Sequence, residues 1–249
     1  SNCFLQYKRH NFMPFKILGV ISILTIFALI FWIPPVNAHL KNITNKKIQF
    51  NYATEVLRDP NQFKALLLAV LLVFGHQVVI TFIVPYFENN VGFDKNLKSL
   101  MYIVGGIATV IASPIIGKIC DRKGNFPSFV VLLLLSFVPI WLSTNITHTN
   151  VNVAFAICIV FFISAAGRII PAYTIMSAAT TPEKRGGFMS MRSAFLELGT
   201  GVAAIVCGLV VHQTTDGKVI HFNYVGYISI ATGLLALYIA SKVKIVSNK

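Results

Sequence analysis

Long apolar runs separated by short polar stretches dominate this sequence. A transmembrane helix needs about 20 mostly apolar residues, and seven runs meet that length. They lie near 16–34, 63–86, 99–118, 127–146, 151–176, 188–212 and 222–241. No strand pattern competes, because backbone that crosses lipid must satisfy its own hydrogen bonds. The pattern therefore predicts an all-α, polytopic transmembrane helix bundle with about seven spans.

The composition agrees with a membrane bundle. The 249 residues are 55% hydrophobic and 12% charged, whereas a soluble domain carries about 25% charged residues. The net charge is +13, but the basic residues lie in short stretches beside apolar runs, which is typical of membrane topology and not of nucleic-acid binding. The four cysteines have no paired or metal-ligand spacing, so we expect free thiols and no metal site. The sequence contains no HExxH or GxSxG motif, so we expect no catalytic residues and no enzyme.

The distribution of Lys and Arg predicts an orientation. Basic residues gather in 36–62, in the loops that follow 99–118 and 151–176, and in the tail, and these parts are expected in the cytoplasm. Arg192, just inside the next run, is counted with the second of these loops. Seven crossings would leave the N-terminus outside, where Lys8 and Arg9 fit poorly, as in a chain that lacks an N-terminal portion.

Four parts follow from this topology. We expect a first transmembrane helix with a short external N-terminus in 1–35, a cytoplasmic linker in 36–62, a six-helix bundle in 63–241 and a cytoplasmic tail in 242–249. The linker is long for a bundle connection, where about 2–8 residues is usual, and 46–57 are expected to form a short surface helix within it. A signal peptide ending at Ala38 is the alternative, but the apolar run exceeds the usual length of about 7–15 residues.

Arg168 and Glu197 lie deep inside two consecutive apolar runs. At a rise of about 1.5 Å per residue, both are expected near the midplane, where secondary transporters bind substrates and coupling ions. Consecutive helices are usually neighbours, so an ion pair or a shared substrate site is open to them. Three interpretations remain: a functional site, a structural ion pair that locks the helices, and a residue that faces a water-filled crevice.

Other polar side chains accompany these two charges. Helical spacing places Ser193 and Thr200 on the Glu197 side of their helix. The run 63–86 contains three polar positions, His76, Gln77 and Thr81. Two interpretations are open: these side chains line a transport pathway, or they only form hydrogen bonds between helices. Pro171 removes a backbone hydrogen bond just after Arg168 and predicts a helix kink, although a tolerated proline is the alternative.

Several segments resemble the major facilitator superfamily of secondary transporters. The stretch from Gly117 to Gly124 reads G-x-x-x-D-R-x-G, the superfamily's signature, at the register the family gives it after the second helix of a six-helix half. LRDPNQFKALLL resembles the entry to the family's seventh helix. The stretch that begins GRIIPAYTIMSAATTPEKRGG resembles the passage from the tenth to the eleventh helix in the drug and sugar efflux permease branch. The resemblance implies that the first helix here is the family's sixth, that the others form its C-terminal half, and that five helices are absent.

The resemblance also implies roles. Asp121 and Arg122, with Gly117 and Gly124, would form a latch that closes the pathway to the cytoplasm, and Arg185 and Gly186 would form the corresponding turn before the next helix. A plain basic turn is the alternative for the signature stretch.

The implied activity is secondary active transport, as proton-coupled efflux of small amphipathic solutes of drug or sugar type across a bacterial inner membrane. The proton gradient would be the energy source and no cofactor is expected. Expected partners are membrane lipid, a small-molecule substrate and the missing N-terminal half or a full-length permease, but no nucleic acid. The alternative is a truncated, non-transporting membrane protein that modulates a full-length permease.

Overall fold

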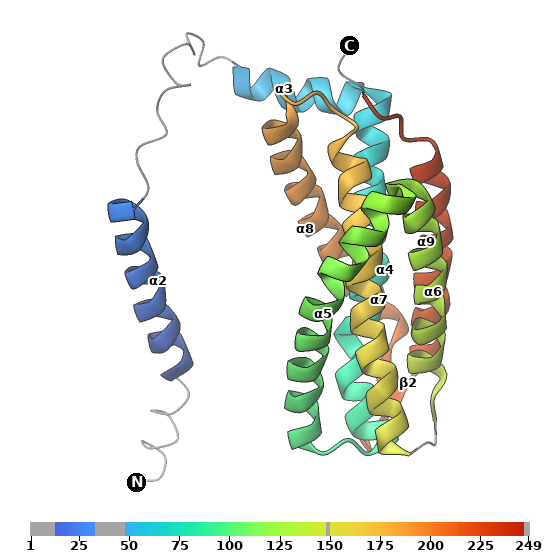
Figure 1. The fold of residues 1–249 in the computed structure, drawn as a ribbon. Helices are drawn as coiled ribbons and strands as arrows, with labels where there is room; N and C mark the ends of the chain where they lie inside the picture. Colours follow the sequence, from blue (N-terminus) through green and yellow to red (C-terminus); the bar gives the residue numbers. More distant parts are fainter. Residues whose placement is uncertain (1–12, 33–47, 148–149, 247–249) are drawn as a thin grey trace. The chain divides into compact units, whose positions relative to one another are not determined.

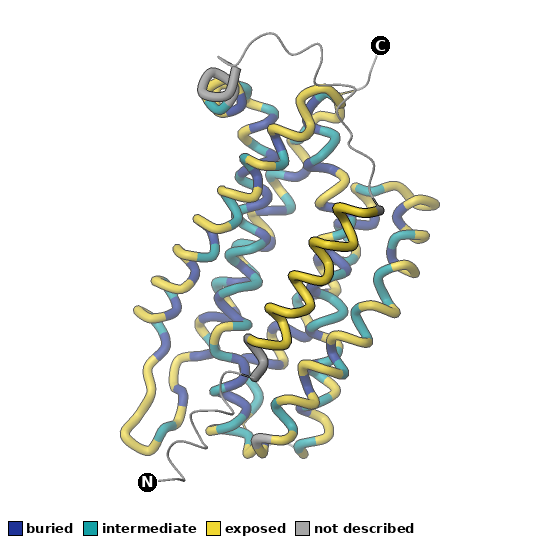
Figure 2. Tube along the Cα trace, turned by 90° about the vertical axis from the view of Figure 1, so that its left-hand side faces the viewer, coloured by how far each residue is buried: buried dark blue, intermediate teal, exposed yellow. Residues whose placement is uncertain are grey.

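The computed structural model describes residues 13–32, 48–147 and 150–246, in two separate units, Ser1–Gln49 and Phe50–Lys249. The first unit contains helix α2 (Met13–Trp32), whose side chains are exposed from Lys16 to Phe31 (Figure 2). This helix matches the first predicted run. The predicted external N-terminus and residues 36–47 of the predicted linker lie outside the described residues.

The second unit is a bundle of six long helices (Figure 1). They are α4 (Pro60–Tyr86), α5 (Lys95–Lys123), α6 (Asn125–Asn145), α7 (Val151–Ser177), α8 (Arg185–Val210) and α9 (Phe222–Ser241). All six are long and apolar enough to cross a membrane. They confirm the predicted all-α, polytopic bundle.

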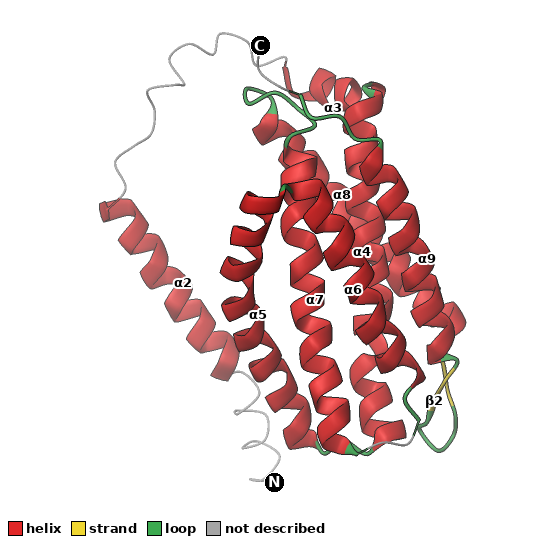
Figure 3. Ribbon diagram, turned by 45° about the vertical axis from the view of Figure 1, so that its right-hand side comes forward, coloured by secondary structure: helices red, strands yellow, loops and turns green. Residues whose placement is uncertain are grey.

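Short elements mark the two ends of this bundle. Helix α3 (Ile48–Arg58) lies across the end of the bundle where α4 begins (Figure 1), and we call this end the α3 end. Its residues include most of the surface helix that was predicted at 46–57. At the opposite end of the bundle, which we call the hairpin end, strands β1 (His212–Gln213) and β2 (Val219–Ile220) pair antiparallel (Figure 3). Because helices alternate in direction, the described parts of the stretches that were predicted to share one side lie at the α3 end: residues 48–62, the connections after α5 and α7, and residues 242–246.

Helix α4 is the centre of the bundle. It packs most extensively against α9 and α8, while α6 packs on α7 and α9, and α5 packs on α7. Leu66 of α4 belongs to a buried cluster at the α3 end that includes Phe129 and Phe188. Ile83 belongs to a second cluster at the hairpin end, together with Phe161. An apolar helix covered on most sides is expected to occupy such a position.

Polar side chains fasten both ends of α4. Asp59 caps its first turn by accepting from the backbone N–H of Asn61 at 2.8 Å. At the hairpin end α4 continues into a π-helical turn, η2 (Phe87–Val91), where the Asn90 amide donates to the Val219 carbonyl at 2.8 Å and accepts from the Val219 N–H at 2.9 Å. These bonds satisfy backbone groups that a helix end and a short strand leave unpaired.

The segment after α9 crosses the α3 end. The Val246 N–H donates to the Ala178 carbonyl at 2.8 Å, and Asn61 binds the backbone of Lys244. Residues 242–246, which were predicted as a plain tail, therefore form a strap that joins the ends of α4, α7 and α9. Residues 247–249 lie outside the described part of the chain.

Candidate functional site

Arg168 is the most deeply buried charge of the bundle. It lies on α7 about 14 Å from the end of that helix, at a rise of about 1.5 Å per residue, and its side chain is 1% exposed. Its Nη1 donates to Ser136 Oγ of α6 at 3.4 Å. Within the described residues its Nε and Nη2 atoms have no hydrogen-bond partner. A guanidinium with unused donors inside an apolar bundle is costly, which points to a ligand or a partner.

The structure does not bring Glu197 to Arg168. Glu197 lies on the exposed side of α8, and the described residues contain no ion pair between the two side chains. The reason is topological: α8 packs along α4 and hardly contacts α7, although α7 and α8 are consecutive. Ser193 is exposed and Thr200 is half-buried on the same side of α8, so the polar face that was predicted for this helix points away from the core of this unit.

The predicted polar positions of α4 separate into two kinds. The His76 ring stacks on Phe161 of α7 with ring centroids 5.6 Å apart, and His76 lies within electrostatic range of Arg168. Its Nδ1 is buried and has no partner in the described chain. Gln77 is half-buried, whereas Thr81 is exposed and donates to the Gln77 carbonyl at 2.6 Å. His76 is therefore the α4 side chain that interacts with α7 and lies within electrostatic range of Arg168. The Thr81 hydroxyl instead forms its hydrogen bond within α4.

Arg192 is a site residue that the sequence analysis missed. It was counted with a basic loop, but it lies inside α8, about 10 Å from its start by the same rise per residue, and is only 9% exposed. Its guanidinium carbon lies 4.4 Å from the centre of the Tyr173 ring of α7, while its buried Nε has no partner among the described residues. The sequence offered a signal, because Phe188 and Leu196 are four residues before and after Arg192 and share its face.

His76 and Arg192 meet at one cavity of about 190 Å³ between α4, α7 and α8. The other lining residues are apolar: Ala69, Leu72, Val73, Ile169, Ala172, Met176 and Leu196. Arg168 does not line this cavity, but it lies within electrostatic range of His76. The arrangement places the nitrogen-bearing side chains of His76 and Arg192 on an otherwise apolar wall, with the guanidinium of Arg168 within electrostatic range of His76.

The signature stretch is helical and not a loop. Helix α5 continues to Lys123, and only Gly124 makes the turn to α6, with a φ of 88° that favours glycine. Gly117 has open space where a Cβ would be, so it is not a point of close helix approach. The side chains of Asp121 and Arg122 are exposed at the α3 end, and neither makes an ion pair within the described chain. The predicted loop is thus corrected to a one-residue turn.

Three further predicted positions lie on helices α7 and α8. Arg185 and Gly186 open α8 and do not form the turn before it, which is made by residues 178–184. Pro171 lies inside α7 and is buried, so the Gly167 carbonyl loses its helical donor. The kink at Pro171 stays a prediction.

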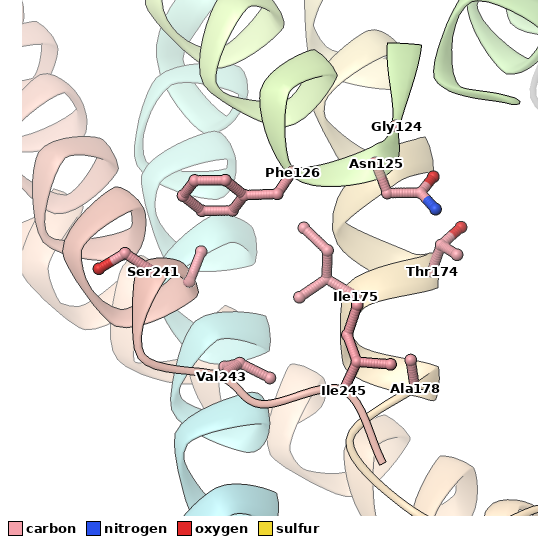
Figure 4. Close-up of a pocket in the computed structure, with 10 residues that line it drawn as sticks. Gly124, Asn125, Phe126, Thr174, Ile175, Ala178, Ser241, Val243 and Ile245 are labelled. Atoms are coloured by element: carbon pink, nitrogen blue, oxygen red, sulfur yellow. The ribbon is translucent and has the colours of Figure 1, made fainter. Parts of the chain in front are cut away.

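A larger pocket of about 430 Å³ lies at the α3 end (Figure 4). Its walls come from the start of α6, the end of α7 and the strap, including Phe126, Ile175, Val243 and Ile245. The side chains around it are mostly apolar, and no unpaired buried charge lines it. Among the described residues, this pocket has no lining side chain with a buried nitrogen atom that lacks a partner, whereas His76 and Arg192 provide such atoms at the smaller cavity.

These features define an integral, multi-pass membrane protein built from apolar helices. Two segments, residues 12–167 and residues 65–247, match the Major Facilitator Superfamily. The chain therefore belongs to this superfamily, as its signature stretch indicated. It is similar to the uncharacterized MFS-type transporter YbcL of Bacillus subtilis (strain 168), with 24% identity over 162 residues, which are 65% of this chain and 40% of that protein. The match spans less than half the length of this curated relative.

Proposed function

We propose that the chain forms part of a secondary active transporter that exports small amphipathic solutes in exchange for protons across a bacterial inner membrane. Membership of the superfamily supports transport, and the curated relative is named as an MFS-type transporter. The observation that carries the proposal is the buried Arg168 in a six-helix bundle, because intramembrane charges are kept where they serve a pathway. The proton gradient is the proposed energy source.

Glu197 is the proposed proton carrier. It is the one acidic side chain in the middle of a span, and it lies on the face of α8 that the described helices leave open. A carboxylate is too costly to face hydrocarbon, so this face is proposed to meet water, a second six-helix half or another copy of the chain. Secondary transporters place their binding site at such an interface between repeats and rock the two sides about it.

Everted membrane vesicles test this proposal on the protein in its native form. Vesicles from cells that produce it are compared with vesicles from cells in which its gene is deleted, and a pH-sensitive dye follows the proton gradient. We expect at least one solute, from a panel with anionic, neutral and cationic head groups, to discharge the gradient only when the protein is present. Glu197→Gln should abolish the discharge, whereas Glu183→Gln, an exposed carboxylate in the loop before α8, should leave it unchanged.

Two results would overturn the proposal. The first is a full panel that moves no protons in vesicles where the protein is present. The second is a discharge that Glu197→Gln leaves intact, which would remove Glu197 from the coupling step.

A further inference from the structure

The cavity beside His76 combines burial with polar nitrogen atoms that have no hydrogen-bond partner among the described residues. Arg192 is 9% exposed and lines the cavity, and its Nε has no partner among the described residues. His76 lines the same cavity with an equally unpaired Nδ1. Arg168, within electrostatic range of His76, adds a second guanidinium with two nitrogens that have no partner among the described residues. Buried polar groups normally have partners, so this concentration at one place points to a ligand.

No carboxylate of the described chain neutralises these arginines. All eight acidic residues lie within the described ranges: Glu55, Asp59, Glu88, Asp94, Asp121, Glu183, Glu197 and Asp216. Seven lie at or beyond the ends of the spans, and Glu197 is exposed on the other side of α8. The described residues contain only two ion pairs, Lys98 with Glu88 and Lys184 with Glu55, and neither involves Arg168 or Arg192.

The missing negative charge defines the ligand's chemistry. An uncompensated buried cation is strongly unfavourable, and an incoming anion removes that cost while it gains charge-assisted hydrogen bonds. Guanidinium donors match the oxygens of carboxylate, sulfonate and phosphate groups. We infer that the cavity binds the anionic head group of the transported solute, with Arg192 as its direct partner and His76 as a second contact; this inference rests on the proposed transport function.

The volume and the lining residues of the cavity indicate the size and polarity of the solute beyond its anionic head group. A volume of about 190 Å³ is below the range of about 300–1,000 Å³ that is usual for complete ligand sites. It holds a head group and a small apolar body, which the side chains of Leu72, Met176 and Leu196 can contact. The solute class is therefore a small amphipathic anion. The charge of Arg168 adds to the positive potential near His76.

Isothermal titration calorimetry on the full chain in phosphatidylcholine nanodiscs tests the inference. Benzenesulfonate is the anionic probe, and benzenesulfonamide is a neutral probe of nearly the same shape. We expect saturable binding of the sulfonate and binding of the sulfonamide that is at least about tenfold weaker, since one charged hydrogen bond accounts for that factor. Equal binding of the two probes would show recognition of shape without charge and would overturn the inference, and this comparison requires no variant.

Variants assign the contact. Arg192→Gln should weaken sulfonate binding by about tenfold or more, and Arg192→Lys should restore part of it because it keeps the charge. Arg58→Gln removes an exposed arginine from α3 and should leave binding unchanged. Unchanged sulfonate binding in a folded Arg192→Gln protein would exclude Arg192 as the partner.

Two further measurements complete the test. The first distinguishes a free anionic solute from a lipid head group, and the second separates this inference from the transport proposal. Sulfonate binding that persists in phosphatidylglycerol nanodiscs supports a free solute, whereas its loss there would assign the cavity to a lipid head group and overturn the inference. Sulfonate binding without any solute-driven proton movement in vesicles would overturn the transport proposal alone. Proton-coupled flux that strictly prefers neutral or cationic solutes would overturn only the anionic class.

Discussion

Asn61 at the start of α4 binds both backbone groups of Lys244, 183 residues later in the chain. Its Nδ2 donates to the Lys244 carbonyl at 2.9 Å, and its Oδ1 accepts from the Lys244 N–H at 2.7 Å. The same Nδ2 donates to the Ala179 carbonyl at 3.1 Å. One side chain therefore fixes the strap and the loop after α7 to the central helix.

Replacing Asn61 should release the strap. Asn61→Ala removes these bonds and leaves backbone groups unpaired, so we expect a loss of about 1–3 kcal/mol of stability. Hydrogen exchange of peptides that cover residues 242–246 should become faster than in the wild type, and thermal unfolding in detergent should begin earlier. Asn89→Ala, an exposed amide in η2, is the matched control. Unchanged exchange in the strap would show that Asn61 does not hold it.

Gly226 is a point where α9 approaches α6 too closely for a side chain. A Cβ at this position would meet the Thr144 side chain, with its Cβ at 2.9 Å, and Thr144 is itself buried. Gly226→Ala should push the helices apart and lower stability by about 1–3 kcal/mol. Gly201→Ala on α8 has open space and should be neutral. Equal effects of the two substitutions in an unfolding titration would contradict this packing argument.

Arg168 should contribute little to stability. Because its Nε and Nη2 are unpaired in the described structure, Arg168→Met replaces a costly buried charge with an apolar chain of similar length. Such replacements are often neutral or stabilising by about 1–4 kcal/mol. We expect an unchanged or higher unfolding temperature together with loss of proton-coupled flux in vesicles. A marked loss of stability would instead reveal a partner that holds the guanidinium.

Asp121 and Arg122 should affect transport without affecting the fold. Both side chains are exposed at the α3 end, so Asp121→Asn and Arg122→Gln should change stability by less than about 0.5 kcal/mol. If the pair forms a latch across the transporter, both variants should reduce flux while binding of the sulfonate probe is retained. Lys123→Gln, an exposed neighbour, is the control. Wild-type flux in both variants would leave the stretch as a plain basic helix end.

The spans were predictable from the sequence because hydropathy reports directly on length and polarity. The six helices of the bundle match the predicted runs within a few residues at each end. The largest difference concerns α5, which reaches Lys123 because one glycine with positive φ is enough to reverse the chain. The hydropathy pattern predicted a loop of several residues here, and it does not indicate that a single residue makes the turn.

The relation between Arg168 and Glu197 was not predictable in the same way. Both were found as charges inside spans, and the short loop between α7 and α8 left an ion pair open as one of three interpretations. In a membrane the outer face of a helix is as apolar as its inner face, so the sequence gives weak information about which face meets which neighbour. The contact of α8 with α4 is a property of the whole bundle. Arg192 was missed for a related reason, since its place near a basic loop concealed its burial.

The polar clamps on α4 have a consequence for how the protein is made. This helix precedes the other five helices of the bundle in the chain, yet the partners of Asn90 and Asn61 come 129 and 183 residues later. Its main packing partners, α8 and α9, are also the last two helices of the bundle in chain order. A growing chain therefore holds an inserted but unassembled α4 until α8, α9 and the strap have been synthesised. Loss of α9 and the strap would leave one side of α4 uncovered and open to membrane quality control, although the preceding spans had already been inserted.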